Sequence, residues 1–268
     1  MNVLIVYAHP EPRSLNGSLK DFAVSVLTNA GHQVQVSDLY AMKWKAVADG
    51  DDFPQRNTNE RLDYGSASGI AFTNGTQLPE IATEQEKLLW ADVVIFQFPL
   101  WWFSMPAILK GWIDRVYAYG FAYGVGAHEG KHWGNRYGEG TLKGRRAMLV
   151  VTLGGREPQY SKRGVNGYID DLLFPINHGV LYYPGMTVLP PLVVYQARRI
   201  QEEEYKKLCK VYEQRLLTLN TTEPIPYRLQ NGGDYDDQQE LKPELEGNAT
   251  GLTIHQAKIP NFLEKSGI

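Results

Sequence analysis

The segment from residue 9 to residue 18 combines polar side chains that could bind an anion. It reads His9-Pro-Glu-Pro-Arg-Ser-Leu-Asn-Gly-Ser18 and lies between an apolar run and a helical pattern. A helix N-terminus offers free N–H groups and a favourable dipole to a phosphate, and His9, Arg13, Ser14 and Asn16 add side-chain donors. The segment matches neither the G-x-G-x-x-G nor the Walker pattern, which disfavours Rossmann and P-loop sites. The alternative is that Ser14 only caps the helix and His9 is structural.

Large apolar rings follow a second apolar run, in the segment Pro99-Leu-Trp-Trp-Phe-Ser-Met-Pro106. At the end of a strand, Leu100, Trp101, Trp102 and Phe103 stand where solvent or a ligand normally reaches. Aromatic faces can stack a flat ring such as an isoalloxazine, while backbone N–H groups reach its heteroatoms. Membership of the core or of a dimer contact is an equally good interpretation for any one of these rings.

A third segment, Thr152-Leu-Gly-Gly-Arg-Glu-Pro-Gln-Tyr160, combines a flexible backbone with a phenol. Gly154 and Gly155 would let the backbone approach a ligand closely, and Tyr160 is a hydrogen-bond donor. The alternative for this segment is a simple turn.

Alternating strands and helices must position these segments. Continuous apolar runs, typical of strands buried on both faces of a parallel sheet, predict strands at 3–7, 34–36, 92–98, 147–152 and 186–194. Helical spacing predicts helices from 15 to about 31, at 84–91, at 165–173 and at 202–216, and one opened by Pro106 with Ser104 as its cap. The order predicts an α/β fold with a doubly wound, five-stranded parallel sheet. Ligands bind such sheets beyond the carboxyl ends of the strands, where the three segments lie.

Two long stretches interrupt or follow this series. Residues 38–83 are rich in Asp, Asn, Gly and Ser, which favours a surface excursion with a helical turn around 62–72. From residue 220 onward the sequence shows little periodicity. We therefore expect a catalytic domain over 1–219 and a C-terminal extension over 220–268 that packs on the core or on a partner subunit.

Composition limits the partners and the compartment. The net charge of −3 argues against nucleic acid or an anionic membrane as the main partner. The single cysteine, Cys209, excludes a disulfide framework and fits a reducing compartment, and its helical neighbours favour a buried core thiol. The N-terminal apolar run is too short for a membrane span or a signal segment, so we expect a cytoplasmic protein without stable membrane insertion.

One motif is a misleading match. His128-Glu-Gly-Lys-His132 fits the H-E-x-x-H zinc pattern, which needs both histidines on one face of a stable helix. The surrounding segment, Gly124 to Gly134, contains four glycines in eleven residues, which disfavours a helix. We therefore expect no metal site.

The three segments together resemble the NAD(P)H:quinone oxidoreductase (DT-diaphorase) family of flavodoxin-like enzymes. The motifs that carry the resemblance are Ala8-His9 with Ser14-Leu-Asn16, Asp38-Leu-Tyr-Ala-Met42, Phe96-Gln-Phe-Pro-Leu100, Trp102-Phe103, Pro106-Ala-Ile-Leu-Lys-Gly-Trp112, Phe121-Ala-Tyr123, Gly154-Gly155 and Tyr160-Ser161. The resemblance implies a flavodoxin-like fold, and FAD rather than FMN as cofactor. It also implies NAD(P)H as electron donor and a quinone-like acceptor.

Residue by residue, the resemblance implies that His9, Ser14 and Asn16 lie near the diphosphate and ribityl chain. It implies that the isoalloxazine is bordered by Pro99, Leu100, Trp102, Phe103, Thr152, Gly154, Gly155 and Tyr160. Family members are homodimers, so Tyr123 and Tyr183 of one chain would cover the flavin of the other and form the substrate pocket.

The chain departs from the family pattern at two positions. Animal members have a histidine six residues after the active-site tyrosine, whereas this chain has Asn166. An amide cannot relay a proton near neutral pH, so Tyr160 or water must supply it. In the helix after the last strand, Tyr205 occupies a position where a basic FAD contact is expected.

Other functions compatible with these residues stay open. Nitroaromatic or azo reduction uses the same chemistry and differs only in the acceptor. Some relatives are flavin-bearing regulatory subunits of potassium-efflux channels. A flavodoxin-like electron carrier is the third alternative, although carriers are normally shorter and more acidic.

Overall fold

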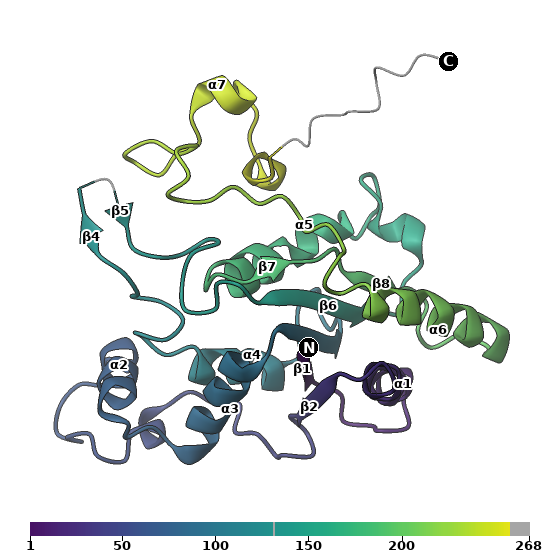
Figure 1. Ribbon diagram of the computed structural model, residues 1–268, viewed down its shortest axis with the longest axis horizontal. Helices are drawn as coiled ribbons and strands as arrows, with labels where there is room; N and C mark the ends of the chain where they lie inside the picture. Colours follow the sequence, from purple (N-terminus) through teal and green to yellow (C-terminus); the bar gives the residue numbers. More distant parts are fainter. Residues whose placement is uncertain (131, 258–268) are drawn as a thin grey trace.

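The computed structural model describes residues 1–130 and 132–257. Its centre is a parallel sheet with the order β2-β1-β3-β6-β7, in which β8 also pairs with β6. The strands are β1 (Asn2–Tyr7), β2 (Gln33–Asp38), β3 (Val93–Pro99), β6 (Arg146–Thr152), β7 (Thr187–Val188) and β8 (Leu192–Val194). The predicted doubly wound α/β fold is confirmed, and Figure 1 shows its arrangement.

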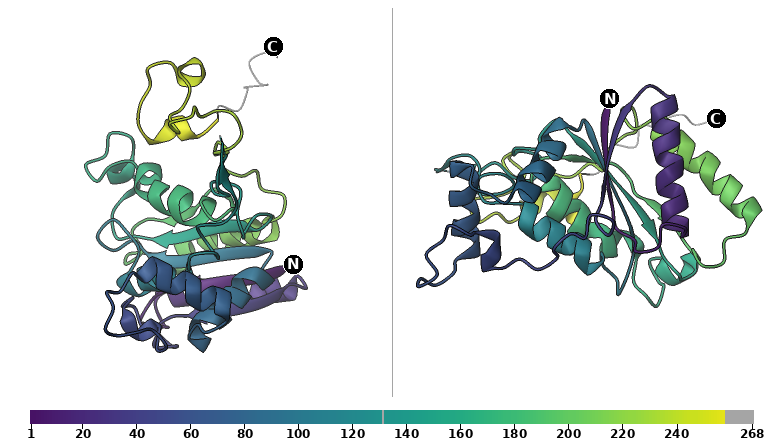
Figure 2. Two further views of the ribbon diagram at one scale, coloured as in Figure 1. Left: turned by 90° about the vertical axis from the view of Figure 1, so that its left-hand side faces the viewer. Right: turned by 90° about the horizontal axis from the view of Figure 1, so that it is seen from below.

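Helices cover both faces of the sheet (Figure 2). One face carries α1 (Leu15–Asn29) and α6 (Glu202–Leu217); the other carries α3 (Pro79–Trp90), α4 (Ala107–Val116), α5 (Ile169–Phe174) and the π-helix η3 (Pro175–Tyr182). Alternate residues of β1 serve the two layers: Val3 and Ile5 pack with α1, whereas Leu4 and Val6 belong to the opposite core. This alternation explains why the strand sequences are apolar throughout.

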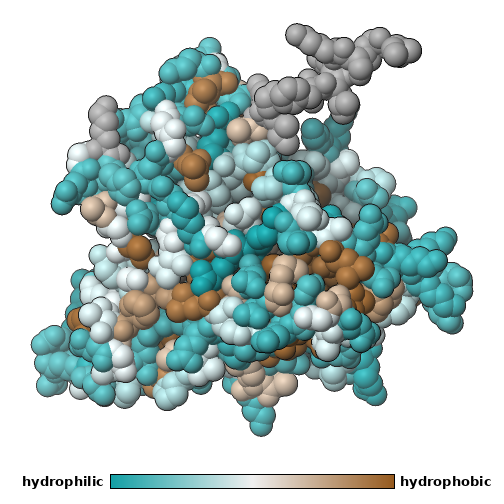
Figure 3. Space-filling view, in the orientation of Figure 1, coloured by the Kyte–Doolittle hydropathy of each residue, from teal (hydrophilic) through white to brown (hydrophobic). Residues whose placement is uncertain are grey.

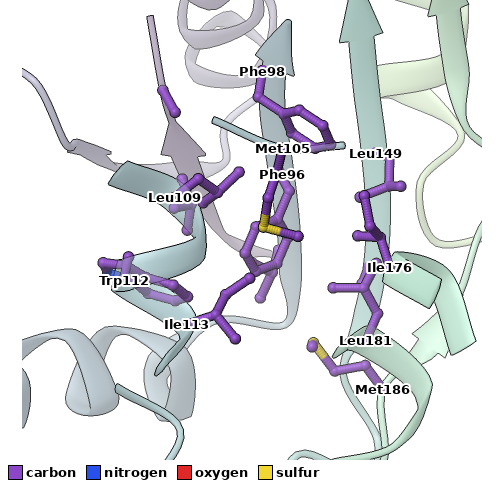
Figure 4. Packing of buried hydrophobic residues seen from close by; sticks show 14 of the residues in the cluster. Phe96, Phe98, Met105, Leu109, Trp112, Ile113, Leu149, Ile176, Leu181 and Met186 are labelled. Carbon is purple, nitrogen blue, oxygen red and sulfur yellow. The ribbon is translucent and has the colours of Figure 1, made fainter. Parts of the chain in front are cut away.

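The larger core lies between β3, β6 and the helices α4 and η3. In Figure 4, Phe96, Phe98 and Trp112 come from one side and Leu149, Leu181 and Met186 from the other. Phe96 and Trp112 meet edge to face with ring centroids 5.8 Å apart. The indole Nε1 of Trp112 donates to Glu84 Oε2 at 2.8 Å, so its polar atom is satisfied inside the core.

Four local expectations were wrong. The helix expected at 84–91 begins at Pro79, because a proline is well suited to a first helical turn. Ser104 does not cap α4; it pairs with Trp101 instead, and α4 has no side-chain cap. The helix expected from residue 165 begins at Ile169. Cys209 is only partly buried, because α6 turns Tyr212 and Leu216 toward the sheet.

The strand expected at 186–194 is divided into β7 and β8. Pro190 and Pro191 lie between the two segments and lack the N–H groups that continuous pairing requires. Both segments pair with β6 in parallel. The predicted fifth strand therefore exists as two short pieces.

The helical turn expected around 62–72 is the helix α2 (Tyr64–Asn74), and the excursion over residues 38–83 also contains η1 (Gly50–Asp52). A buried ion pair fastens it to α4. Arg115 and Asp52 are both fully buried, with a nitrogen–oxygen distance of 2.9 Å, and Tyr64 donates its hydroxyl to Asp52 at 2.9 Å. Burial opposes ionisation of Asp52, but the hydrogen bonds from Arg115, Tyr64 and Lys45 outweigh it and keep the pKa of Asp52 below its usual value.

The chain after residue 220 packs on the core and then rises above it, with α7 (Pro243–Glu246) at the top of Figure 1. Ile225 N donates to Val188 O at 2.8 Å, and Tyr182 donates its hydroxyl to Tyr227 O at 3.0 Å. Arg228 is buried and pairs with Asp234 and Glu246. The part of the expected extension over residues 258–268 lies outside the described residues. Figure 3 shows apolar side chains in a band across the middle of the molecule, below this segment.

His178 is enclosed where this segment meets η3. Its ring stacks between Phe174 and Tyr137, with centroids 4.7 Å away on each side. Burial, with a smaller effect of His255, lowers the pKa of His178 to about 4. Burial also lowers the pKa of His255, with a smaller effect of Arg228. Both rings are therefore held neutral in the folded protein.

We expect the folded state to lose stability as the pH falls below about 6.5, the unfolded pKa of histidine, toward 4, because the unfolded chain binds protons that folded His178 does not. The variant His178→Phe keeps the stacking and cannot titrate. Between pH 7.5 and pH 4.5, the free energy of unfolding of the variant should fall by about 2 kcal/mol less than that of the wild type. This figure is reduced for the partial exposure of His178. Urea unfolding at pH 7.5 and pH 4.5 measures this difference, and equal losses in both proteins would contradict it.

Candidate flavin site

The three predicted segments meet at the carboxyl ends of β1, β3 and β6. Backbone hydrogen bonds keep these ends level: Ala8 N donates to Gln97 O at 3.0 Å and Leu100 N donates to Thr152 O at 2.8 Å. A cavity of about 410 Å³ opens there. The expected residues that line it are His9, Ser14, Asn16, Pro99, Leu100, Thr152 and Gly154. Since β1 connects to β2 on one side and lies beside β3 on the other, this is the topological switch point of the sheet.

His9 lines the cavity, and its Nδ1 is held by the loop that follows it. This nitrogen lies 3.1 Å from both the backbone nitrogen and the carbonyl oxygen of Glu11 and 3.0 Å from Ser14 Oγ. Ser14 caps α1 and accepts from Gly17 N at 3.2 Å, so the capping interpretation also holds. Arg13, which we expected as a further donor, has a side chain that is 88% exposed and pairs with Glu11 outside the cavity.

Buried polar atoms form the floor of the cavity. Asn16 donates to Thr152 Oγ1 at 2.7 Å, and Gln97 donates to the Asn16 carbonyl at 2.5 Å. Two buried oxygens, Asn16 Oδ1 and Gln97 Oε1, have no hydrogen-bond partner among the residues that the structure describes. A buried acceptor without a donor costs about 1–3 kcal/mol, so Asn16 Oδ1 suits a ligand that brings a hydroxyl group. The backbone of Pro12 passes directly over Gly17, and only glycine fits there, because a Cβ would lie 1.8 Å from the Pro12 carbonyl oxygen.

The aromatic segment forms a two-residue turn. Trp101 and Ser104 exchange backbone hydrogen bonds of 3.0 Å, and both residues between them, Trp102 and Phe103, have left-handed backbones with φ of 50° and 63°. Trp101 lines the cavity, with its ring 6.1 Å from that of His9. Trp102 and Phe103, which we expected beside the isoalloxazine, lie outside the lining and are 94% and 48% exposed.

Gly155, Tyr160 and Asn166 form a second layer next to the cavity. Tyr160 is 9% exposed and packs against Tyr195 with ring centroids 6.0 Å apart. A Cβ on Gly155 would lie 2.7 Å from Tyr160 Cε2, so glycine is needed for this approach. Asn166 is tied to the same loop, because its N–H donates to Gln159 O at 3.0 Å. None of the three lines the cavity itself.

Tyr123 and Tyr183 are not brought to this cavity. Tyr123 packs edge to face on Tyr119 with centroids 5.4 Å apart, and Tyr183 packs on Tyr137 at 5.0 Å. The structure therefore separates the expected cover of the flavin from the expected flavin cavity of the same chain.

Sequence reasoning missed several lining residues, namely Leu15, Leu153, Ala197 and Arg198. Arg198 belongs to the loop after β8, whose end is also a carboxyl end of the sheet. The rule that selected the other three loops could have selected this one. This loop brings a basic side chain to the cavity, whereas Tyr205 is outside its lining.

The zinc-like motif forms a hairpin of β4 (His128–Glu129) and β5 (His132–Trp133) rather than a helix. The prediction that this segment is not helical is confirmed. Among residues 1–130 and 132–257, no group of three His, Cys, Asp or Glu side chains could hold a metal ion. The same ranges contain no helix with the length and apolar character needed to cross a bilayer.

Comparison with known proteins gives a consistent result. Residues 1–216 match a family model described as a flavodoxin-like fold. The chain is 52% identical over 257 residues to a ribosyldihydronicotinamide dehydrogenase-like protein of Penicillium crustosum, with 95% of each chain covered. It is 34% identical over 258 residues to NAD(P)H dehydrogenase (quinone) 1 of Cavia porcellus, covering 94% of this chain and 91% of the relative. A Klebsiella pneumoniae structure assigned to a quinone reductase superimposes with a TM-score of 0.94 at 60% identity, over 96% of this chain and 100% of that one. The chain therefore belongs to the flavodoxin-like family of NAD(P)H:quinone oxidoreductases.

Proposed function

We propose that this enzyme transfers a hydride from NAD(P)H, through a bound FAD, to a quinone. The family implies a flavin and a nicotinamide donor. The observation that carries the proposal is the cavity at the switch point, whose lining combines the polar side chains of His9, Ser14 and Asn16 with the apolar side chains of Leu100 and Trp101. This combination of polar and apolar groups fits a flavin with a phosphate-bearing tail.

The residues present fit FAD. The imidazole of His9, the N–H groups at the start of α1 and the guanidinium of Arg198 would hold a diphosphate. Asn16 Oδ1, which has no hydrogen-bond partner among the described residues, would accept from a ribityl hydroxyl. Pro99, Leu100, Trp101, Thr152 and Gly154 would surround the ring system.

In this proposal the flavin accepts a hydride from the donor and delivers it to the acceptor. The chain itself binds and orients the ring and supports charge on the acceptor. As a hydride reaches a quinone carbon, negative charge develops on the quinone oxygen, and the Tyr160 hydroxyl stabilises it by donating a hydrogen bond or its proton. Asn166 cannot titrate and orients water or substrate.

We propose that the second subunit of a homodimer completes the site. Trp102, Phe103, Tyr123 and Tyr183 lie outside the cavity of their own chain, which supports a role toward the cavity of a partner. The extension over 220–268 would belong to this assembly, beside the catalytic domain over 1–219. The free thiol of Cys209 supports a reducing compartment such as the cytoplasm.

Quinone reduction is favoured over the other functions because relatives that cover most of the chain are named quinone oxidoreductases. Nitroaromatic or azo reduction and a regulatory role at a potassium-efflux channel have no feature of the site in their favour. The length of the match and the fastened C-terminal segment also disfavour a simple electron carrier.

The purified protein should absorb near 450 nm as a flavoprotein, and the flavin released on denaturation should be FAD rather than FMN. Chromatography of the released flavin and anaerobic titration with NADPH, NADH and dihydronicotinamide riboside test the cofactor and the donor together. We expect bleaching by at least one donor and reoxidation by a quinone. A protein that binds neither FAD nor FMN on reconstitution contradicts the proposal, and FMN alone contradicts the FAD assignment.

A further inference from the structure

A second cavity adjoins the first and shares Gly154 with it. It has a volume of about 420 Å³ and is lined by Gly154, Arg156, Gln159, Gln196 and Arg199. Arg156 comes from the loop after β6 and Arg199 from the loop after β8. The residue types at this place are two guanidinium groups and two amides, with no carboxylate in the lining.

Hydrogen bonds join the two loops into one rigid unit. Gln196 N donates to Gly155 O at 3.0 Å, and Arg199 N donates to Gln196 O at 2.7 Å. Arg156 N donates to Gln159 Oε1 at 2.7 Å. Gln196 is held in a left-handed conformation with φ of 53°, which a non-glycine residue adopts only when its surroundings demand it. The backbones that carry both arginines are therefore fixed before any ligand arrives.

In the described part of the chain, neither Arg156 nor Arg199 takes part in an ion pair, whereas Arg115 pairs with Asp52 and Arg228 pairs with Asp234. Both arginines are exposed at the cavity, so an anion can reach them from solvent. Guanidinium groups bind phosphate oxygens through paired hydrogen bonds, and the amides of Gln159 and Gln196 can add donors.

The cavity shares Gly154 with the flavin cavity, and Gln159 in its lining directly precedes Tyr160 in the chain. Gly154 and Tyr160 are the residues that the proposed function places beside the flavin ring and the acceptor. A hydride donor must lay its nicotinamide against the same ring, so its phosphates would lie within reach of a cavity that adjoins this place. The FAD diphosphate is already matched by His9, Ser14 and Arg198 on the other cavity.

We propose that Arg156 and Arg199 bind a phosphate of the nicotinamide dinucleotide donor, either in its diphosphate or at the 2′ position. This inference rests on the proposed function and deepens it. It makes phosphate-bearing donors better ligands than dihydronicotinamide riboside, which has no phosphate to offer.

The test uses the flavin-loaded enzyme and the variants Arg156→Ala, Arg199→Ala and the double variant, with Arg163→Ala as control. Arg163 is exposed on the same loop region and lines neither cavity. Calorimetric titration with NADP⁺ and with NAD⁺ measures binding without turnover, and stopped-flow mixing measures flavin reduction by NADPH, NADH and dihydronicotinamide riboside.

Each single variant should raise the Kd for NADP⁺ roughly 10- to 100-fold, which is the usual loss for a hydrogen bond to a charged group. Reduction by dihydronicotinamide riboside, flavin retention and the Arg163→Ala variant should not change. If only NADP⁺ binding and reduction by NADPH weaken, the arginines bind the 2′-phosphate. If NAD⁺ binding and reduction by NADH weaken equally, they bind the diphosphate. Both outcomes support the inference.

An unchanged Kd in the double variant overturns the inference, as does a wild type that binds neither nucleotide. Release of FAD from both single variants also overturns it, since the cavity would then hold part of the flavin. If no donor reduces the wild-type flavin, the proposed function fails instead, and the nucleotide titrations still decide what the arginines bind.

Discussion

Replacement of Tyr160 by phenylalanine should slow quinone reduction roughly 10- to 1000-fold, a range that covers typical losses of a positioned donor or general acid. Tyr160 is 9% exposed, packs on Tyr195 and approaches Gly155 so closely that only glycine fits there. The removed hydroxyl leaves this packing intact. The loss should therefore fall on the half-reaction in which charge develops on the quinone, and reduction of the flavin by the nicotinamide donor should keep its rate.

Asn166→Ala is the matched control for this prediction. Asn166 holds its place through a backbone N–H to Gln159 O, a bond that alanine keeps, so the loop should not move. Because an amide cannot release a proton near neutral pH, its loss should affect the rate less than that of Tyr160. Stopped-flow measurement of each half-reaction decides between them: a larger defect in Asn166→Ala would reverse the assigned roles.

Replacement of Asp52 by alanine should lower the free energy of unfolding by about 3 kcal/mol or more, as expected when one partner of a buried ion pair is removed. The variant leaves Arg115 fully buried with Glu80 as its remaining acidic partner and takes an acceptor from Tyr64. Because this pair fastens the excursion to α4, the loss should come with earlier proteolysis within residues 38–83. Denaturant unfolding and limited proteolysis measure the two effects.

An exposed ion pair on α4 provides the comparison. Lys110 and Asp114 are 2.5 Å apart, with side chains 56% and 42% exposed. Asp114→Ala should change stability by less than about 0.5 kcal/mol, because solvent screens such pairs. If Asp52→Ala and Asp114→Ala lowered the free energy of unfolding equally, burial would not be the reason for the contribution of Asp52.

The strands and the loops after them could be predicted because each depends on local pattern. Apolar runs mark β1, β3 and β6, and His9, Asn16 and Thr152 reach one cavity because parallel strands end at one edge. The split of the last strand follows from Pro190 and Pro191, a signal that was present but not used. Arg198 was missed for the same reason, since its loop also follows a strand end.

Other features depend on contacts between distant residues. Nothing local to Asp52 shows that Arg115, far along the chain, will neutralise it. Trp102 and Phe103 both have left-handed backbones. Two adjacent aromatic residues in a sequence do not suggest this conformation. The enclosure of His178 requires Tyr137 and Tyr227 from separate segments to meet it.

The turn at Trp102 and Phe103 lowers the stability of the fold but carries two aromatic rings with a proposed role in the site of the partner subunit. Two-residue turns with two left-handed positions favour Asn-Gly, whereas each aromatic residue in that conformation costs roughly 1–2 kcal/mol. A selection for heat resistance alone should therefore replace these residues with Asn and Gly and yield a sturdier fold. The same selection would remove the two exposed rings that we propose to act in the site of the partner subunit. Engineering for shelf life should leave this turn untouched and seek its gains elsewhere.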